Sequence, residues 1–190
     1  LLGVARNAGL VAYAMPSFEQ YLPRLARHKG LRRRSNVPRF AGQDNATDAA
    51  VALRENSFKK GLFCICMAST GTGKTLAYLL PILQLLDEHI PKVQCLIVVP
   101  SRELALQIEQ VWKKMGTAFK VNVCYGGHAI ETELKNLSTP PALLIGTPGR
   151  LTDHLARKSF ATESIKTLVL DEFDKSLQLG FQEDMNTILS

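Results

Sequence analysis

Short apolar runs alternate with polar segments along the chain from Gly61 onward. Each run ends in a cluster of Gly, Pro, Ser or Thr, and a segment with helical spacing of its apolar positions follows. This alternation predicts βαβ units. Because most runs are continuously hydrophobic, as strands covered on both faces are, the pattern predicts an α/β domain: a three-layer fold with helices on both faces of a parallel sheet. The predicted strands are Leu62–Met67, Cys95–Val99, Val121–Tyr125, Ala142–Ile145 and Ile165–Leu170.

The helical segments show their apolar faces in the same way. Apolar residues after Ser101 recur at spacings of four, three and four, which predicts one buried face of a helix that also carries Trp112. These residues are Leu104, Ile108, Val111 and Met115. A second helix is predicted over 75–86, kinked at Pro81. Right-handed crossovers would place the loops that follow the strands at one edge of the sheet.

Residues 1–60 do not share this pattern. They contain eleven Lys or Arg against four Asp or Glu, whereas residues 61–190 contain twelve against thirteen. Only Ala46–Arg54 has the spacing of a modest helix. We therefore divide the chain into a basic N-terminal arm of uncertain structure (1–60) and an α/β domain (61–190). The charge is consistent either with a polyanion partner such as nucleic acid or with a solvated basic tail.

Composition narrows the class of protein further. With 46% hydrophobic and 21% charged residues, the chain has the composition of a soluble globular protein. The longest apolar stretch, Leu76 to Leu86, has eleven residues and contains Pro81 and Gln84, whereas a membrane span needs about twenty. We expect no membrane span and a cytoplasmic protein. Its four cysteines, Cys64, Cys66, Cys95 and Cys124, are predicted to be buried thiols rather than zinc ligands.

A glycine-containing segment lies between the first predicted strand and the helix after it. Two glycines let successive N–H groups turn toward an anion at a helix N-terminus, a lysine adds positive charge near the β- and γ-phosphates, and a threonine offers a hydroxyl to Mg²⁺. This context predicts a phosphate-binding loop. Its residues are Ala68, Ser69, Thr70, Gly71, Thr72, Gly73, Lys74 and Thr75.

Acidic residues follow the last predicted strand. Asp171, Glu172 and Asp174 come directly after Leu170. A Mg²⁺ ion bound through Asp171 would neutralise the cluster, and Glu172 is suited to deprotonate an attacking water. The alternative is a set of acids that favour a helix N-terminus.

Together these motifs resemble the first RecA-like domain of the DEAD-box family of ATP-dependent RNA helicases, over Ala68 to Phe181. The family's D-E-A-D stands as Asp171-Glu-Phe-Asp174, and its P-T-R-E-L-A as Pro100-Ser-Arg-Glu-Leu-Ala105. The paired glycines and T-P-G-R stand as Gly126-Gly127 and Thr147-Pro-Gly-Arg150. The resemblance implies a P-loop NTPase fold, ATP and Mg²⁺ as cofactors, and single-stranded or duplex RNA as partner.

The resemblance also implies roles for individual residues. Lys74 and Thr75 would bind phosphate and metal, Asp171 would act on the metal, and Glu172 would be the catalytic base. Thr147 is a predicted N-cap with Pro148 as the first helical residue, so a helix N-terminus would face an anion there. The predicted nucleic-acid contacts are Pro100, Ser101, Arg102, Gly126, Gly127, Thr147, Pro148, Gly149 and Arg150.

Some family features have no match in the chain. Val51 stands where the family's adenine-reading Gln is expected, and the family's S-A-T motif has not been reached by Ser190. We expect the second RecA-like domain in the full-length chain. We expect a fragment that binds nucleotide but hydrolyses it slowly. A divergent arm, an unrelated extension and a mis-framed reading all stay open for residues 1–60. Two further readings of the whole are a DNA helicase or translocase of the same superfamily and a non-hydrolysing RNA-binding fragment.

Overall fold

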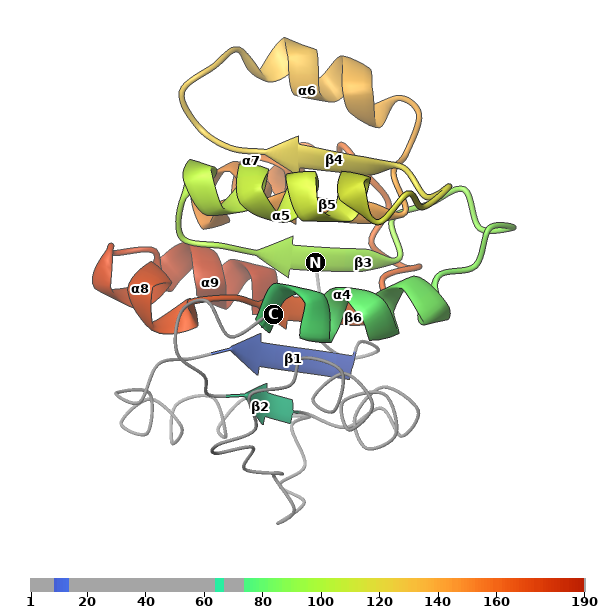
Figure 1. The fold of residues 1–190 in the computed structure, drawn as a ribbon. Helices are drawn as coiled ribbons and strands as arrows, with labels where there is room; N and C mark the ends of the chain where they lie inside the picture. Colours follow the sequence, from blue (N-terminus) through green and yellow to red (C-terminus); the bar gives the residue numbers. More distant parts are fainter. Residues whose placement is uncertain (1–8, 14–63, 67–73, 190) are drawn as a thin grey trace.

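The chain folds around a parallel sheet. The computed structural model describes residues 9–13, 64–66 and 74–189, and within this part of the chain six strands are ordered β2-β1-β6-β3-β5-β4 (Figure 1). Every pairing is parallel, as the sequence predicts. The strands are β1 (Gly9–Tyr13), β2 (Cys64–Cys66), β3 (Cys95–Val98), β4 (Val121–Cys124), β5 (Leu143–Gly146) and β6 (Thr167–Leu170).

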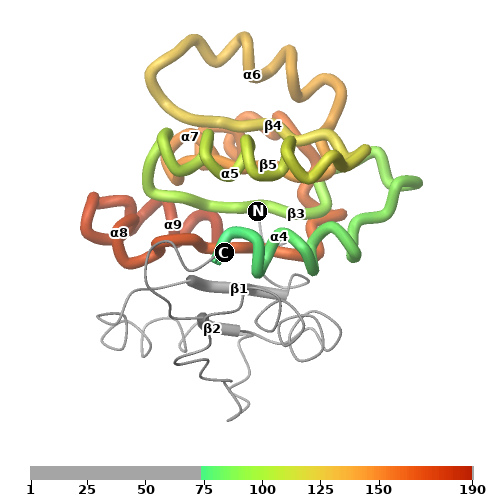
Figure 2. The backbone as a smooth tube through the Cα atoms, in the orientation of Figure 1, coloured from blue at the N-terminus to red at the C-terminus, as the bar shows by residue number. Residues whose placement is uncertain are grey.

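Helices cover both faces of the sheet. One face packs against α4 and α5, and the other against α7, α8 and α9, while α6 lies beyond β4 (Figures 1 and 2). This arrangement confirms the predicted three layers. The helices are α4 (Lys74–Leu85), α5 (Arg102–Lys114), α6 (Ile130–Leu137), α7 (Pro148–Ala156), α8 (Phe173–Gln178) and α9 (Gln182–Leu189). In the described part of the chain no helix is both long and apolar enough to cross a bilayer.

The central strands explain the continuous apolar runs of the sequence. In β3, Cys95 and Ile97 face the α4 and α5 side, whereas Leu96 and Val98 face the other layer. All four are buried, because successive side chains of a strand point to opposite faces and both faces are covered. Burying each aliphatic side chain stabilises the fold by about 1.5–3 kcal/mol.

The helix α5 shows how the predicted apolar face packs. Ala105, Ile108 and Trp112 are buried against the sheet. The Trp112 indole Nε1–H donates to the Phe119 carbonyl at 3.1 Å, so its polar atom is satisfied inside the core. This confirms the prediction that Trp112 packs in the core. The helix α4 continues through Pro81, and the Pro81 side chain is buried together with those of Tyr78 and Ile82.

One strand comes from the segment predicted as an N-terminal arm. β1 lies between β2 and β6, with Gly9 opposite Thr167 and Ala12 opposite Leu170. The sequence indicates only an arm of uncertain structure over residues 1–60, and five of these residues, Gly9–Tyr13, form this strand beside β6. The boundary at residue 60 and the helix predicted over Ala46–Arg54 lie outside the described residues.

Candidate nucleotide and nucleic-acid site

The acidic motif lies where β6 ends, against the first turns of α4. Asp171 is buried, and its Oδ2 accepts a hydrogen bond from the Tyr78 hydroxyl at 3.1 Å. Its other oxygen, Oδ1, is buried without a hydrogen-bond partner among the described residues. A buried carboxylate oxygen without a partner is unfavourable unless a cation or a donor is supplied to it.

The surroundings of Asp171 set its protonation. Burial raises the pKa of this carboxyl to about 6, against the opposing effects of the Tyr78 hydrogen bond and the positive charge of Lys74. Burial and the Asp171 carboxylate also raise the pKa of the Tyr78 hydroxyl, which a hydrogen bond with Thr75 opposes. The structure thus brings Thr75 and Asp171 together around Tyr78, with the Lys74 charge close enough to act on Asp171. The other predicted phosphate-loop residues, 68–73, lie outside the described residues.

Glu172 stands apart from its acidic neighbours. It occupies the N-cap position of α8 with φ 49° and ψ 43° and makes no capping hydrogen bond with its side chain. A left-handed backbone at a non-glycine residue is strained by about 1–3 kcal/mol and is often found at functional sites. The turn buries Asp171 and Asp174 on either side, while Glu172 stays partly exposed and pairs with Lys175 at 2.9 Å.

Most of the predicted nucleic-acid contacts converge on one pocket of about 450 Å³ at the carboxyl ends of β3, β4 and β5. Seven of the nine predicted residues line it, and Gly127 and Pro148 are the two that do not. Asp153 and Phe181 complete the lining, and neither was predicted. The lining residues are Pro100, Ser101, Arg102, Gly126, Thr147, Gly149, Arg150, Asp153 and Phe181.

Two arginines supply the positive charge of this pocket. The Arg102 guanidinium lies over the Tyr125 ring, 4.9 Å from its centroid, in a cation–π contact. Arg150 Nη2 donates to the His128 carbonyl at 2.7 Å, and its side chain is only 12% exposed. The acidic residue of the lining, Asp153, pairs with Arg157 at 2.9 Å, and this ion pair offsets the negative charge of Asp153.

Backbone geometry shapes the rest of the pocket. α7 begins at Pro148 with Thr147 as its N-cap residue, as predicted, but the Thr147 side chain makes no capping hydrogen bond. The first N–H groups of α7 are therefore not capped by this side chain, and a helix N-terminus in that state favours an anion. Gly127 has φ 96°, a conformation that favours glycine.

Sequence reasoning missed a buried cluster beside this pocket. Glu133 and His154 are almost completely buried and lie 2.6 Å apart, from Glu133 Oε2 to His154 Nε2. Glutamate on an amphipathic helix normally faces solvent, so its type and position predict an exposed side chain. The prediction of buried thiols is confirmed for Cys95 and Cys124, which are free and buried; the side chains of Cys64 and Cys66 lie outside the described residues.

Similar solved structures define the class of fold. The crystal structure of the yeast DEAD-box splicing factor Prp28 aligns over 64% of this chain and 30% of its own, with 37% identity and a TM-score of 0.57. A hypothetical ATP-dependent RNA helicase from Sulfolobus tokodaii aligns over 64% and 35%, with 32% identity and a TM-score of 0.56. The domain therefore has the RecA-like fold of P-loop NTPases.

Sequence comparison gives the family. The DEAD/DEAH box helicase model matches residues 47–190, so the chain belongs to this family. The ATP-dependent RNA helicase CshA of Limosilactobacillus reuteri is 44% identical over 132 residues, which are 68% of this chain and 27% of that protein. The chain spans about a quarter of the length of the curated relatives it matches.

Proposed function

We propose that this chain carries the ATP-binding core of an ATP-dependent RNA helicase. In the whole protein, hydrolysis of ATP would drive local separation of RNA strands or remodelling of RNA–protein complexes. The observation that carries the proposal is the convergence of Asp171 with Lys74, and of the Arg102, Gly126 and Arg150 segments, at the carboxyl-end edge of one parallel sheet. That edge is where open α/β sheets bind their ligands.

The corner around Asp171 fits a nucleotide with its metal. Asp171 Oδ1 is buried without a partner among the described residues and is suited to a cation, with Thr75 as a second oxygen donor. Lys74 would bind the β- and γ-phosphates through its ammonium group. When bound, Mg²⁺ would neutralise charge on the phosphates. Glu172, partly exposed beside this corner, would accept the proton of the attacking water.

The pocket fits the backbone of a single RNA strand. Arg102 and Arg150 offer positive charge and the N-terminus of α7 offers N–H groups, which are donors suited to phosphates. Backbone contacts of this kind bind without sequence selectivity. The curated relatives are named ATP-dependent RNA helicases, which favours RNA over DNA as the polymer.

Turnover by the 190-residue chain alone should be slow. By the family resemblance, arginine fingers belong to a second RecA-like domain, and such residues contribute roughly 10³ to 10⁵ in the rate of phosphoryl transfer. Robust RNA-stimulated ATP hydrolysis by this chain would contradict the proposal that fast turnover needs groups from a second RecA-like domain.

Substitution of Lys74 tests the nucleotide site. Lys74→Ala should weaken binding of a fluorescent ATP analogue with Mg²⁺ by at least about a hundredfold, since it removes the charge facing the phosphates. Single-stranded RNA affinity should change less than twofold, because the pocket is built from other residues. Fluorescence titration and anisotropy measure the two affinities.

Lys92→Ala is the matched control. Lys92 is a half-exposed lysine that pairs with Glu163 at 2.7 Å, and both residues precede their strands, at the opposite ends of β3 and β6 from the two sites. It should leave both affinities unchanged. Equal nucleotide binding by Lys74→Ala and Lys92→Ala would show that no nucleotide site exists at α4.

A further inference from the structure

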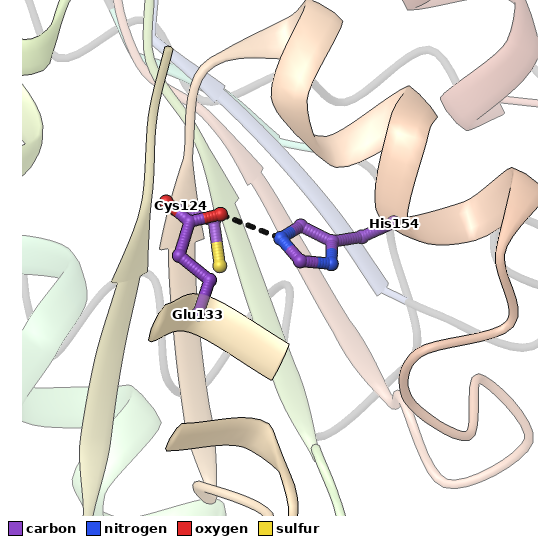
Figure 3. A group of neighbouring side chains, drawn as sticks. All are labelled: Cys124, Glu133 and His154. Carbon is purple, nitrogen blue, oxygen red and sulfur yellow. Dashed lines mark hydrogen bonds and ion pairs between the residues drawn. The ribbon is translucent and has the colours of Figure 1, made fainter. Parts of the chain in front are cut away.

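The buried carboxylate of Glu133 lies beside the proposed RNA pocket. Figure 3 shows Cys124 from β4, Glu133 from α6 and His154 from α7 pointing toward one another. Their sulfur, oxygen and nitrogen atoms lie within 4.8 Å of one another, and all three residues are buried. The side chain of Glu133 is 3% exposed, so its contacts inside the protein decide its role.

Both oxygens of Glu133 receive donors from different segments. Oε1 accepts the Tyr125 backbone N–H at 3.0 Å and lies 2.9 Å from His128 Nε2. Oε2 lies 2.6 Å from His154 Nε2 and 3.7 Å from Arg150 Nε. Because a carboxylate only accepts hydrogen bonds, His154 Nε2 must carry a hydrogen.

The resulting charge is stable at neutral pH. Burial by itself would raise the pKa of Glu133, but the hydrogen bonds from His154 and Tyr125 and the charge of Arg150 outweigh it and lower the pKa. Glu133 is thus an ionised buried carboxylate whose oxygens are satisfied by the chain itself.

The same trio has the ligand types of a zinc site, but its contacts favour another role. The carboxylate oxygens already receive hydrogen bonds, and the Arg150 cation stands beside Oε2, where it would repel a metal ion. Burial also raises the pKa of the Cys124 thiol, which disfavours the thiolate that zinc requires.

Glu133 is connected to both arginines of the pocket. It contacts Arg150 directly, and Arg150 Nη2 also donates a hydrogen bond to the His128 carbonyl. The connection to Arg102 runs through Tyr125. The Tyr125 backbone N–H donates to Glu133, and the Tyr125 ring lies under the Arg102 guanidinium. Without this carboxylate, Arg150 would lose its anionic partner. The Tyr125–His128 turn would lose the acceptor of its Tyr125 N–H.

We propose that Glu133 is a positioning residue of the RNA pocket, which fixes Arg150 and the Tyr125–His128 turn in the geometry that binds the phosphate backbone. This inference rests on the proposed function, because it assumes that the pocket binds RNA. It assigns to α6, which contributes no residue to the pocket lining, a part in nucleic-acid binding.

The test compares Glu133→Gln with the wild-type chain for binding of a labelled single-stranded polyuridine RNA, by anisotropy over a range of salt concentrations. Gln keeps the shape but removes the charge beside Arg150. Affinity should fall roughly three- to tenfold, and the slope of log affinity against log salt should fall by about one, as for Arg150→Ala. Glu131→Gln, an exposed acid in the first turn of the same helix, should change affinity less than twofold.

A double-mutant cycle separates positioning from general destabilisation. In the Arg150→Ala background, Glu133→Gln should lower affinity by a clearly smaller factor than in the wild-type background, because one of the two groups that Glu133 positions is gone and only the Tyr125–His128 turn remains. An equal loss in both backgrounds would overturn the proposal. Glu133→Asp, which withdraws the charge by one methylene, should give an intermediate loss and serves as the second variant if Glu133→Gln does not fold.

Two further outcomes would also overturn it, and they are distinguishable. Failure of the wild-type chain to bind RNA even at low salt would refute the proposed function, and this inference with it. Wild-type binding with an unchanged Glu133→Gln would refute the inference alone. Stoichiometric binding of Co²⁺ with a thiolate absorption band, lost in Cys124→Ser, would assign the cluster to a metal instead.

Discussion

Asp171 and Glu133 are buried carboxylates on the same domain, each with 3% of its surface exposed, yet their pKa values move in opposite directions. The pKa of Asp171 rises to about 6 because burial outweighs the hydrogen bond from Tyr78, the Lys74 charge and a backbone hydrogen bond from Glu172. The pKa of Glu133 falls because the hydrogen bonds from His154 and Tyr125, with the Arg150 charge, outweigh burial. Equal burial therefore does not imply an equal role.

The number of donors distinguishes the two carboxylates. Asp171 keeps one oxygen without a partner among the described residues, whereas the oxygens of Glu133 face donors from two segments, the Tyr125–His128 turn and α7. An unsatisfied buried anion favours an external cation, and a satisfied one fixes the groups around it. We accordingly assign ligand binding to the Asp171 corner and internal positioning to Glu133.

The largest expected effect on stability comes from Glu133→Ala. It leaves the Tyr125 N–H, His128 and His154 without their acceptor, and removing one partner of a buried ion pair costs about 3–5 kcal/mol. Because the pKa of Glu133 is lowered on folding, its contribution is complete above the unfolded pKa of 4.5 and is lost as pH falls through the folded pKa. Urea unfolding at neutral and acid pH measures both effects.

Glu131→Ala is the control for that change, since Glu131 is exposed on the same helix. It should alter the free energy of unfolding by less than about 0.5 kcal/mol. A loss below about 1 kcal/mol for Glu133→Ala would mean that the hydrogen bonds around this carboxylate stabilise nothing.

Asp171→Asn should act in the opposite direction. The folded chain holds the Asp171 proton up to about pH 6, whereas the unfolded chain loses it near 3.8, so stability falls as pH rises through this window. The difference corresponds to about 3 kcal/mol. Asn removes the buried charge, so it should stabilise the nucleotide-free chain by up to that amount above pH 6 and have no effect below pH 4.

Unfolding curves of wild type and Asp171→Asn between these pH values measure the difference. Glu183→Gln, which neutralises an exposed acid of α9, should leave the pH dependence as in wild type. With Mg²⁺ and ATP present, wild type alone should gain stability, because ligand binding to the folded state stabilises it. Destabilisation by Asp171→Asn at neutral pH would contradict the interpretation that the Asp171 carboxylate is a destabilising, incompletely satisfied charge in the nucleotide-free chain.

Sequence alone predicted the strand and helix pattern because buried strands and amphipathic helices leave distinct periods. The predicted strands over 95–99, 121–125, 142–145 and 165–170 match β3 to β6 within two residues at each end. β1 was not predicted, because five residues are too few to show a helical or strand period. Pairing with β6 is a long-range contact that local spacing does not encode.

The site residues also fall into a predicted and a missed group. The sequence predicted most of the pocket residues because they stand in short contiguous motifs, each motif follows a strand, and parallel strands end at one edge of the sheet. Glu133 and His154 were missed because their contact joins α6 to α7 across 21 positions, and neither residue stands in a motif. The roles of the predicted residues stay predictions, whereas their convergence is a property of the fold.

Ser101→Ala should have the smallest effect and separates capping from RNA contact. Ser101 Oγ accepts the Leu104 N–H at 3.2 Å and caps α5, directly before Arg102. Losing an N-cap costs about 1 kcal/mol, so unfolding in urea should show this loss, while RNA affinity should fall less than in Arg102→Ala. Ser101→Thr keeps a capping hydroxyl and should restore both. An RNA affinity that falls as far as in Arg102→Ala, with unfolding unchanged, would instead place the Ser101 hydroxyl on the RNA.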